Sequence, residues 1–283
     1  DWMLGQMLMV MLVEEILAQR AKEKTQCPNC EKCGVRLQSK GFVERQILCI
    51  LGRIRWERRV GRCPKGCKIG QVAPLDEDLE IKPYQQTSME VKKIGSSLAI
   101  FVAYETAASL MKQIIGIEVS SSSIWQWVQA SGKQAKQWLE KEMLEMAEGQ
   151  MPKPEQIEAI AGLPIIMGAD GVMVGFRPNG GNPKGKTIWH EVKIGIIARL
   201  KKQTNRVGQI VQRLTQRRLV GVLGNIDELS KRLTLEAHKQ SISQASTVVW
   251  LSDGARGLWR LFTQDFSHWA IGVLDFYHAA QYL

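Results

Sequence analysis

All six cysteines of this 283-residue chain lie between positions 27 and 67. Cys27-Pro-Asn-Cys30 is separated by 32 residues from Cys63-Pro-Lys-Gly-Cys67, and strand-like runs occupy part of the interval, at residues 46–50 and 53–56. Zinc held by four thiolates needs two tight turns, each supplying two sulfurs, and a folded segment that brings the turns together. The spacing therefore predicts a zinc ribbon over residues 26–80. Its predicted ligands are Cys27, Cys30, Cys63 and Cys67.

The other two cysteines leave this ligand set open. Cys33 belongs to a second knuckle-like turn, Cys30-Glu-Lys-Cys33-Gly, and Cys49 has the position of a buried thiol in a strand. The remainder of the chain has no cysteine, which argues against a secreted protein held together by disulfides. A reducing compartment, the cytoplasm with its nucleoid, fits a metal site better.

Positive charge is concentrated around the cysteines. The formal net charge is +10, and residues 20–68 hold 14 Lys or Arg against 4 Glu, so this segment accounts for the whole excess. A local basic patch of this kind neutralises phosphates and releases counterions, which makes nucleic acid the expected partner. The predicted DNA contacts in this segment are Arg53, Arg55, Arg58 and Arg59.

The first residues predict a helix. Residues 2–13 are apolar and rich in Met. The run is shorter than the roughly 20 residues that span a bilayer, and it is followed by Glu14 and Glu15. We therefore expect an amphipathic helix within residues 1–25, no membrane partner, and neither a signal peptide nor a transmembrane anchor. Because the first residue is Asp1, the chain is expected to begin inside a reading frame.

Residues 81–150 have a helical composition. Residues 104–115 carry apolar side chains at helical spacing, Gly116 ends that helix, and Ser120 can cap a second helix. Two helices joined by a short turn that contains Gly predict a helix-turn-helix, whose second helix would enter the major groove of DNA. The candidate DNA contacts are Ser121, Ser122, Ser123 and Gln126.

Strand patterns begin after a linker at residues 151–154, where we place the domain boundary. Runs at 164–169, 172–176 and 192–199 predict three antiparallel strands. A helix beginning at Asn225, a strand at 247–251, a short helix and a fifth strand at 269–274 follow. This order predicts a ribonuclease H-like α/β catalytic domain over residues 160–283, and the whole chain is predicted to be α+β and multidomain.

Two aspartates give this predicted domain its chemistry. Asp170 follows the first strand run and Asp253 follows the fourth, and these strands are neighbours in a ribonuclease H-like sheet. Their carboxylates should therefore converge. Two convergent oxygen ligands can hold Mg²⁺ or Mn²⁺ ions roughly 3.5–4 Å apart, one activating a water or 3′-hydroxyl and one stabilising the leaving oxygen of a phosphodiester. Asp275, at the end of the fifth strand, is the alternative to Asp253.

Several blocks of the sequence resemble a known family, the bacterial insertion-sequence transposases of the ISKra type, which are relatives of the Mutator-like elements. The blocks are CPNC, CPKGC, APLDE, VSSSSIWQWVQ, GADGVMVGFRPNGGNPKGKT, VVWLSDGARGLW and VLDFYHAAQYL. The resemblance implies a DDE transposase that acts on terminal inverted repeats and target DNA, as a homo-oligomer when active. It implies that Asp170 and Asp253 are the first two acidic residues of the site, and that Asp275 and His278 form a DxxH signature beside it. His278 is equally open to a structural role.

The family resemblance also implies a third carboxylate, a glutamate on a later helix. The sequence stops at Leu283 without such a residue, and Glu191, at the start of the third strand, is a poor substitute. We therefore expect little strand-transfer activity from this polypeptide alone. Two alternatives remain: a non-catalytic DNA-binding remnant that represses its element, and another ribonuclease H-like nuclease, such as a repair nuclease.

Overall fold

The computed structural model describes residues 2–23, 27–69, 72–154, 158–176 and 186–275. These residues form two compact units, Asp1–Ala135 and Lys136–Leu283. Each unit combines helices with a sheet, so the expected α+β class is confirmed. The division between the units falls inside helix α5 (Ser121–Ala147), whereas the sequence predicted the boundary at the linker of residues 151–154.

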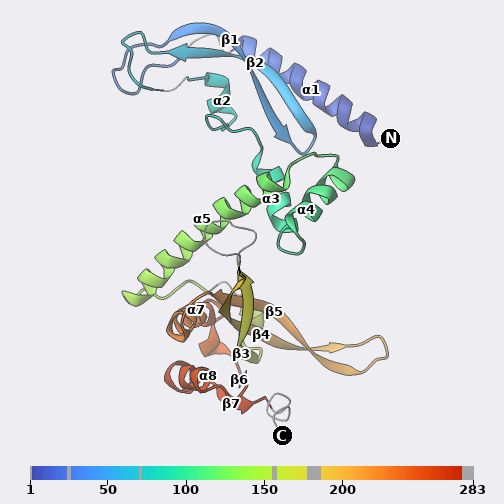
Figure 1. Cartoon of the computed structure of the whole chain (residues 1–283), viewed down its shortest axis with the longest axis vertical. Helices are drawn as coiled ribbons and strands as arrows, with labels where there is room; N and C mark the ends of the chain where they lie inside the picture. The colour runs from blue at the N-terminus through green and yellow to red at the C-terminus, as the bar shows by residue number, and fades with distance from the viewer. Residues whose placement is uncertain (1, 24–26, 70–71, 155–157, 177–185, 276–283) are drawn as a thin grey trace. The chain divides into compact units, whose positions relative to one another are not determined.

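The first unit begins with a helix on a two-stranded ribbon. Strands β1 (Gln38–Cys49) and β2 (Gly52–Arg62) pair antiparallel and are longer than the predicted runs. Helix α1 (Trp2–Glu23), expected from the sequence, lies along β2 (Figure 1). The buried cluster between α1, the ribbon and the next helix contains Leu17, Ala21, Ile47, Ile54, Trp56 and Leu75.

Of the described helices, none combines the length and the apolar content that crossing a bilayer requires.

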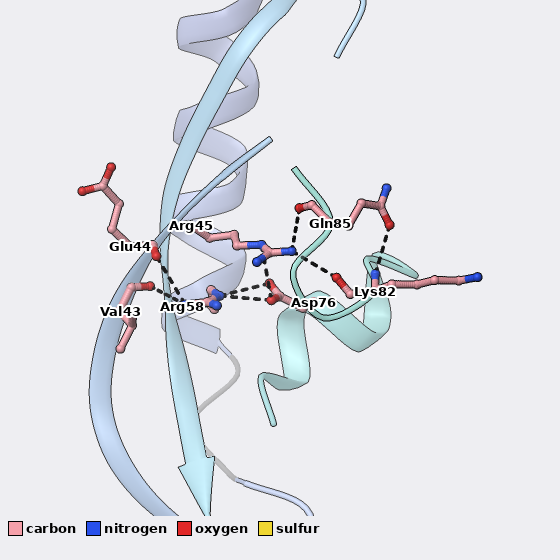
Figure 2. A network of polar contacts seen from close by, with 7 residues as sticks. All are labelled: Val43, Glu44, Arg45, Arg58, Asp76, Lys82 and Gln85. Carbon is pink, nitrogen blue, oxygen red and sulfur yellow. Dashed lines mark hydrogen bonds and ion pairs between the residues drawn. The ribbon is translucent and has the colours of Figure 1, made fainter. Parts of the chain in front are cut away.

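An arginine–aspartate pair joins the ribbon to helix α2 (Pro74–Asp78), as Figure 2 shows. Arg58, on β2, is only 7% exposed, and its Nε lies 3.2 and 3.1 Å from the two carboxylate oxygens of Asp76. Its Nη1 donates to the carbonyl of Val43 at 2.8 Å. A buried cation needs a paired anion and further acceptors, and here Asp76 and a strand carbonyl supply them.

A second arginine extends this contact network. Arg45, on β1, donates through Nη2 to the carbonyls of Lys82 and Gln85, at 3.1 and 2.8 Å (Figure 2). Its Nε lies 3.9 Å from the carboxylate of Asp76. The turn that follows α2 is therefore held on the ribbon through its own backbone carbonyls, and this contact does not involve the side chains of the turn.

Three helical elements follow in the first unit. They are α3 (Met89–Leu98), α4 (Tyr104–Leu110) and a wider π-helical turn, η1 (Met111–Ile115), which continues α4. Gly116 ends this stretch with a φ of 73°, and Ser120 accepts a hydrogen bond from the N–H of Ser123 at 3.1 Å. The predicted stop and start of the two helices are thus confirmed.

The helix that follows Ser120, α5, is long. It is a single helix of 27 residues. Near its start, Ile124 is fully buried and Trp127 packs into the same cluster, while Trp125 is 49% exposed. Only one of the two tryptophans therefore serves the core of this unit.

The second unit is built on a five-stranded sheet of order β5-β4-β3-β6-β7. Strands β3 (Ile165–Phe176), β4 (Ile188–Thr204) and β5 (Ile210–Val222) are antiparallel neighbours. Strands β6 (Val248–Ser252) and β7 (Ile271–Leu274) continue the sheet parallel to β3 and to each other. The strand that carries Asp170 is thus a direct neighbour of the strand that leads to Asp253, as predicted.

The three antiparallel strands are not the three that were predicted. The first two runs, 164–169 and 172–176, belong to one strand, because β4 pairs with β3 continuously from Ile165 to Phe176 through Asp170 and Gly171. The predicted third strand is β4, and β5 was not predicted. The Asp-Gly pair resembles a turn locally, but a long-range partner offers its backbone a full set of ladder hydrogen bonds.

Helices cover one face of this sheet. Residues 165, 167 and 169 of β3 are buried, so they share the covered face, as alternate residues of a strand do. Helix α7 (Ile226–Lys239) starts as expected, with Asn225 accepting a hydrogen bond from the N–H of Glu228 at 2.9 Å. The remaining elements are α6 (Glu158–Ala161), η2 (Ile242–Gln244), α8 (Arg256–Leu261) and η3 (Phe262–Phe266).

Arg199 of β4 is a buried cation that links this strand to the segments before β3 and after α7. It is fully buried, and its Nη1 donates to the carbonyls of Ala161 and Leu163 at 2.6 and 2.7 Å. Its Nη2 donates to the carbonyl of Gln240, which follows α7. Burial lowers the pKa of the guanidinium. Carbonyl dipoles therefore compensate this charge, and no carboxylate of the described ranges pairs with it.

We expect Arg199→Leu to destabilise the second unit by about 3 kcal/mol, because three buried carbonyls would lose their donor. Urea unfolding followed by tryptophan fluorescence, which reports on buried Trp250, measures the change. The matched control is Arg206→Leu, which removes an exposed arginine. Equal midpoints for the two variants would contradict this role of Arg199.

Candidate metal centres

Four cysteines gather in the first unit. The sulfurs of Cys30, Cys33, Cys63 and Cys67 lie within 4.8 Å of one another, and those of Cys33 and Cys63 are 3.5 Å apart. No other group of three or more potential metal ligands in the described part of the chain is as close. This cluster could hold a metal ion such as zinc, for which four thiolates are a common ligand set.

Two similar turns present these sulfurs. In the first turn, the N–H of Gly34 donates to the carbonyl of Cys30 at 2.8 Å, and Gly34 has a φ of 68°. In the second turn, the N–H of Gly66 donates to the carbonyl of Cys63 at 3.2 Å, and Gly66 has a φ of 70°. Glycine adopts this left-handed conformation without steric cost, which allows both turns to be tight.

The structure corrects one predicted ligand, because Cys33 and not Cys27 completes the cluster. Residues 27–30 lie in an extended segment, in which Asn29 pairs with Arg36 and Pro28 accepts from the N–H of Leu37 at 3.0 Å. In extended backbone, residues three apart project to opposite sides, and the sulfur of Cys27 is not among those of the cluster. Cys27 is instead buried against Gly61.

The sequence did contain a signal for this ligand set. Cys33 is followed directly by Gly34, the residue that closes its turn, whereas Cys30 in the first pair is followed by Glu31. A cysteine pair whose turn ends in glycine indicates a metal-binding knuckle better than the distance between the cysteines alone.

The thiols differ in acidity. Burial would raise the pKa of Cys63, but hydrogen bonds from the N–H of Cys67, from the Cys33 thiol and from the N–H of Lys65 lower it to about 6. The pKa of Cys67 rises to about 12 because its thiol is hydrogen-bonded to Cys33 and Cys63 and is buried. One thiolate therefore forms readily, and full ionisation of the cluster requires a cation.

We expect Cys33→Ser to lose most of the bound zinc, whereas Cys27→Ser keeps about one zinc ion per chain. Of these two residues, only Cys33 contributes a sulfur to the four-cysteine cluster. Metal analysis of both purified variants after dialysis measures the difference. The opposite pattern, with zinc lost from the Cys27 variant alone, would restore the ligand set expected from the sequence.

Three aspartates line up across the second unit. The β3–β6 register joins Ile165 to Val248 and Gly168 to Leu251, and the same offset continued brings Asp170 level with Asp253. The β6–β7 register ends at Ser252 and Leu274, so Asp253 and Asp275 follow residues that are directly paired. The N–H of Asp275 donates to the carbonyl of Ser252 at 2.9 Å. Asp170, Asp253 and Asp275 therefore occupy equivalent positions on neighbouring strands.

These aspartates lie on the face of the sheet that the helices leave open. Asp170 is one residue beyond buried Ala169 and is exposed, and Asp253 is one residue beyond buried Ser252 and is partly exposed. All three aspartates line one cavity of about 220 Å³, whose other walls are mainly apolar. Asp170 and Asp253 also line a larger cavity of about 660 Å³, together with Glu191.

Backbone groups hold two of these carboxylates. Asp170 Oδ1 accepts from the N–H of Gly171 at 2.7 Å, and Asp253 Oδ1 accepts from the N–H of Ala255 at 3.0 Å. Trp259 donates through Nε1 to the carbonyl of Asp253 at 2.7 Å. Within the described residues, Oδ2 of Asp170 and of Asp253 accepts no hydrogen bond. Each carboxylate therefore keeps one oxygen for a cation.

Two further candidates for this site are Glu191 and His278. Glu191 forms an ion pair with Lys193 at 2.7 Å, so its carboxylate already has a partner. The aspartates are not gathered as tightly as the thiols. His278 lies outside the described residues.

The candidate DNA contacts lie on both parts of the first unit. Ser122 and Gln126 are exposed at the start of α5, while Ser121 and Ser123 are partly exposed. The Oγ atoms of Ser123 and Ser120 are 2.9 Å apart, so Ser123 takes part in the helix cap.

The four candidate arginines on β2 point in different directions. Arg53 and Arg55 are exposed, and Arg59 is partly exposed and lies over the ring of Phe42 at 4.9 Å. Arg58 is buried on the opposite face and paired with Asp76, which corrects its predicted role in DNA contact. Strand alternation separates it from its neighbours.

We expect Arg58→Leu to destabilise the first unit by about 3 kcal/mol, because it leaves the mostly buried carboxylate of Asp76 with only the more distant cation of Arg45. Arg55→Leu, the matched control on the exposed face, should change stability by less than about 0.5 kcal/mol. Thermal unfolding of the zinc-loaded protein compares the two. A similar loss in both variants would mean that the ion pair does not hold α2 in place.

Comparisons with known proteins add little to this geometry. Neither a family model nor a curated protein sequence matches the chain. Among solved structures, the Drosophila P element transposase in its strand transfer complex is similar over 67% of this chain and 38% of that chain, with a TM-score of 0.29 and 11% sequence identity. A likeness at this level does not establish a shared fold.

Proposed function

We propose that the chain is part of a DNA transposase in which Asp170 and Asp253 hold the divalent cations for phosphodiester cleavage at transposon ends. The observation that supports this most strongly is the register of β3 and β6. It brings the two aspartates level on neighbouring parallel strands, beside the same cavities. Fixed, adjacent carboxylates are what a two-cation site for phosphoryl chemistry needs.

The order of the sheet supports a ribonuclease H-like assignment for this unit. Three antiparallel strands are followed by two parallel strands added beside the first, with α7 between β5 and β6 and α8 between β6 and β7. This is the order expected from the sequence, although the positions of two strands differ. The motif resemblance described above points to the same family of DDE transposases.

The chemistry of the aspartates fits Mg²⁺ or Mn²⁺. Carboxylate oxygens are the preferred ligands of these hard cations, and Asp170 and Asp253 each keep one oxygen without a hydrogen bond in the described part of the chain. A bound cation pair supplies nucleophile activation and stabilisation of the leaving oxygen. The backbone hydrogen bonds to Asp170 and Asp253 orient these carboxylates before the cations bind.

The first unit supplies DNA binding in this proposal. Zinc at Cys30, Cys33, Cys63 and Cys67 stabilises the ribbon, whose outer face presents Arg53 and Arg55. The α4–α5 pair acts as a helix-turn-helix, with Ser122 and Gln126 exposed at the start of its second helix. Terminal inverted repeats are the proposed DNA partner, and the active form is proposed to be a homo-oligomer.

We expect the zinc-loaded protein to bind Mn²⁺ and Asp253→Asn to lose at least tenfold in Mn²⁺ affinity, because a ligand oxygen loses its charge. Asp275→Asn should lose less. Isothermal titration with Mn²⁺ measures both changes. The control is Asp227→Asn, which alters a carboxylate that is 69% exposed at the start of α7.

Two results would change this proposal. Equal Mn²⁺ binding by the unchanged protein and the Asp253 variant, with a loss for the Asp275 variant, would make Asp275 the second ligand. If neither Asp253→Asn nor Asp275→Asn altered Mn²⁺ binding while the protein still bound duplex DNA, the non-catalytic DNA-binding alternative would be preferred.

A further inference from the structure

The β4–β5 hairpin extends well beyond the helix-covered part of the sheet (Figure 1). A bulge shifts the register between Ile197 and Arg199, opposite Gln216, whose φ is 50°. Beyond it the strands stay paired from Arg199 and Thr215 out to Thr204 and Ile210. At about 3.3 Å per residue, this two-stranded arm reaches roughly 17–20 Å. Bulges bend a strand pair and often redirect its outer part.

The arm carries positive charge without compensating negative charge. The sequence contains no acidic residue between Glu191 and Asp227. Four exposed basic side chains of the arm form no ion pair within the described residues, and these are Lys201, Lys202, Arg206 and Arg213; a fifth, Arg217, lies at the bulge. The basic segment recognised from the sequence, residues 20–68, does not include them.

Two of these cations are placed directly opposite each other. Lys201 pairs with Arg213 across the ladder, so both side chains lie on the same face at the closest cross-strand position. Like charges in this arrangement destabilise a strand pair. A solvated surface would place a carboxylate or a neutral residue there, whereas a surface that binds an anion gains from both cations.

The tip of the arm is held in a defined shape. Asn205 Oδ1 accepts hydrogen bonds from the N–H groups of Val207 and Gln209 at 3.0 and 2.9 Å. Gly208 follows with a φ of 81° and donates to the carbonyl of Asn205 at 3.1 Å. This turn presents Arg206 at the end of the arm, so basic groups occur along its length and at its tip.

We propose that the β4–β5 arm binds the phosphate backbone of duplex DNA, with Lys201 and Arg213 contacting adjacent phosphates. This rests on the proposed function, which makes DNA the substrate class of this unit. A two-stranded ribbon fits the major groove, and basic groups distributed along a narrow arm match the linear array of phosphates that a duplex presents.

The test removes the opposed pair from the full chain. In Lys201→Gln/Arg213→Gln, we expect the affinity for a mixed-sequence duplex to fall about tenfold or more at 100 mM NaCl. The slope of log affinity against log salt should decrease by about 2, since each phosphate contact contributes about 0.9. The matched control, Lys153→Gln/Lys231→Gln, removes two exposed lysines from the same unit, and its binding should equal that of the unchanged protein.

The stability of the variant separates this proposal from a structural role. Since the substitution removes a like-charge contact, its melting temperature without DNA should equal or exceed that of the unchanged protein. A variant that melts earlier and binds DNA with an unchanged salt slope would overturn the proposal.

The remaining outcomes distinguish the arm from the proposed function. If the unchanged protein binds duplex DNA and the double variant binds it equally well, the arm is not a DNA contact, and the proposed function stands. If the unchanged protein binds no DNA, both the proposal for the arm and the proposed function fail. Binding to vesicles with and without phosphatidylserine is measured as a further comparison. Loss of binding to anionic vesicles alone would assign the arm to a membrane and overturn the proposal.

Discussion

The second unit depends on the parallel ladder between β3 and β6. Because side chains alternate along a strand, a slip of one residue in β6 would exchange its two faces. Trp250, which is fully buried and stacks on Phe266 with ring centroids 5.5 Å apart, would move to the open face. Asp253 would then lie under the helices, where a carboxylate is costly. The packing of one tryptophan thus fixes the register, and the register places the aspartates together.

Features controlled by neighbouring residues could be predicted from the sequence. The start of α7 at Asn225, the end of η1 at Gly116 and the cap of α5 at Ser120 each need only a local hydrogen bond or a residue that tolerates a positive φ. The order of the strands around Asp170 and Asp253 was also predictable, because each predicted strand run is bounded by a turn or by the start of a helix. Local patterns therefore gave most of the element order.

Features that depend on distant partners could not be predicted. The Asp170-Gly171 pair resembles a turn until β4 provides a partner along the whole length of β3. Strand β5 carries three arginines and an exposed surface, so its sequence lacks the apolar alternation of a covered strand. Cys27 has the right spacing to Cys30, but pairing of residues 28–29 with residues 36–37 makes that segment extended. In each case a long-range backbone contact decided between two locally acceptable conformations.

The repulsion between Lys201 and Arg213 makes the stability of the β4–β5 hairpin depend on the ionic strength of the solvent. Their repulsion acts in the free arm, and counterions in the solvent screen it. A more concentrated electrolyte therefore makes the two strands easier to hold together. The same electrolyte weakens any attraction between the arm and a polyanion. In dilute electrolyte the two cations repel each other most and attract a polyanion most strongly, so a bound polyanion would relieve the repulsion between the two strands.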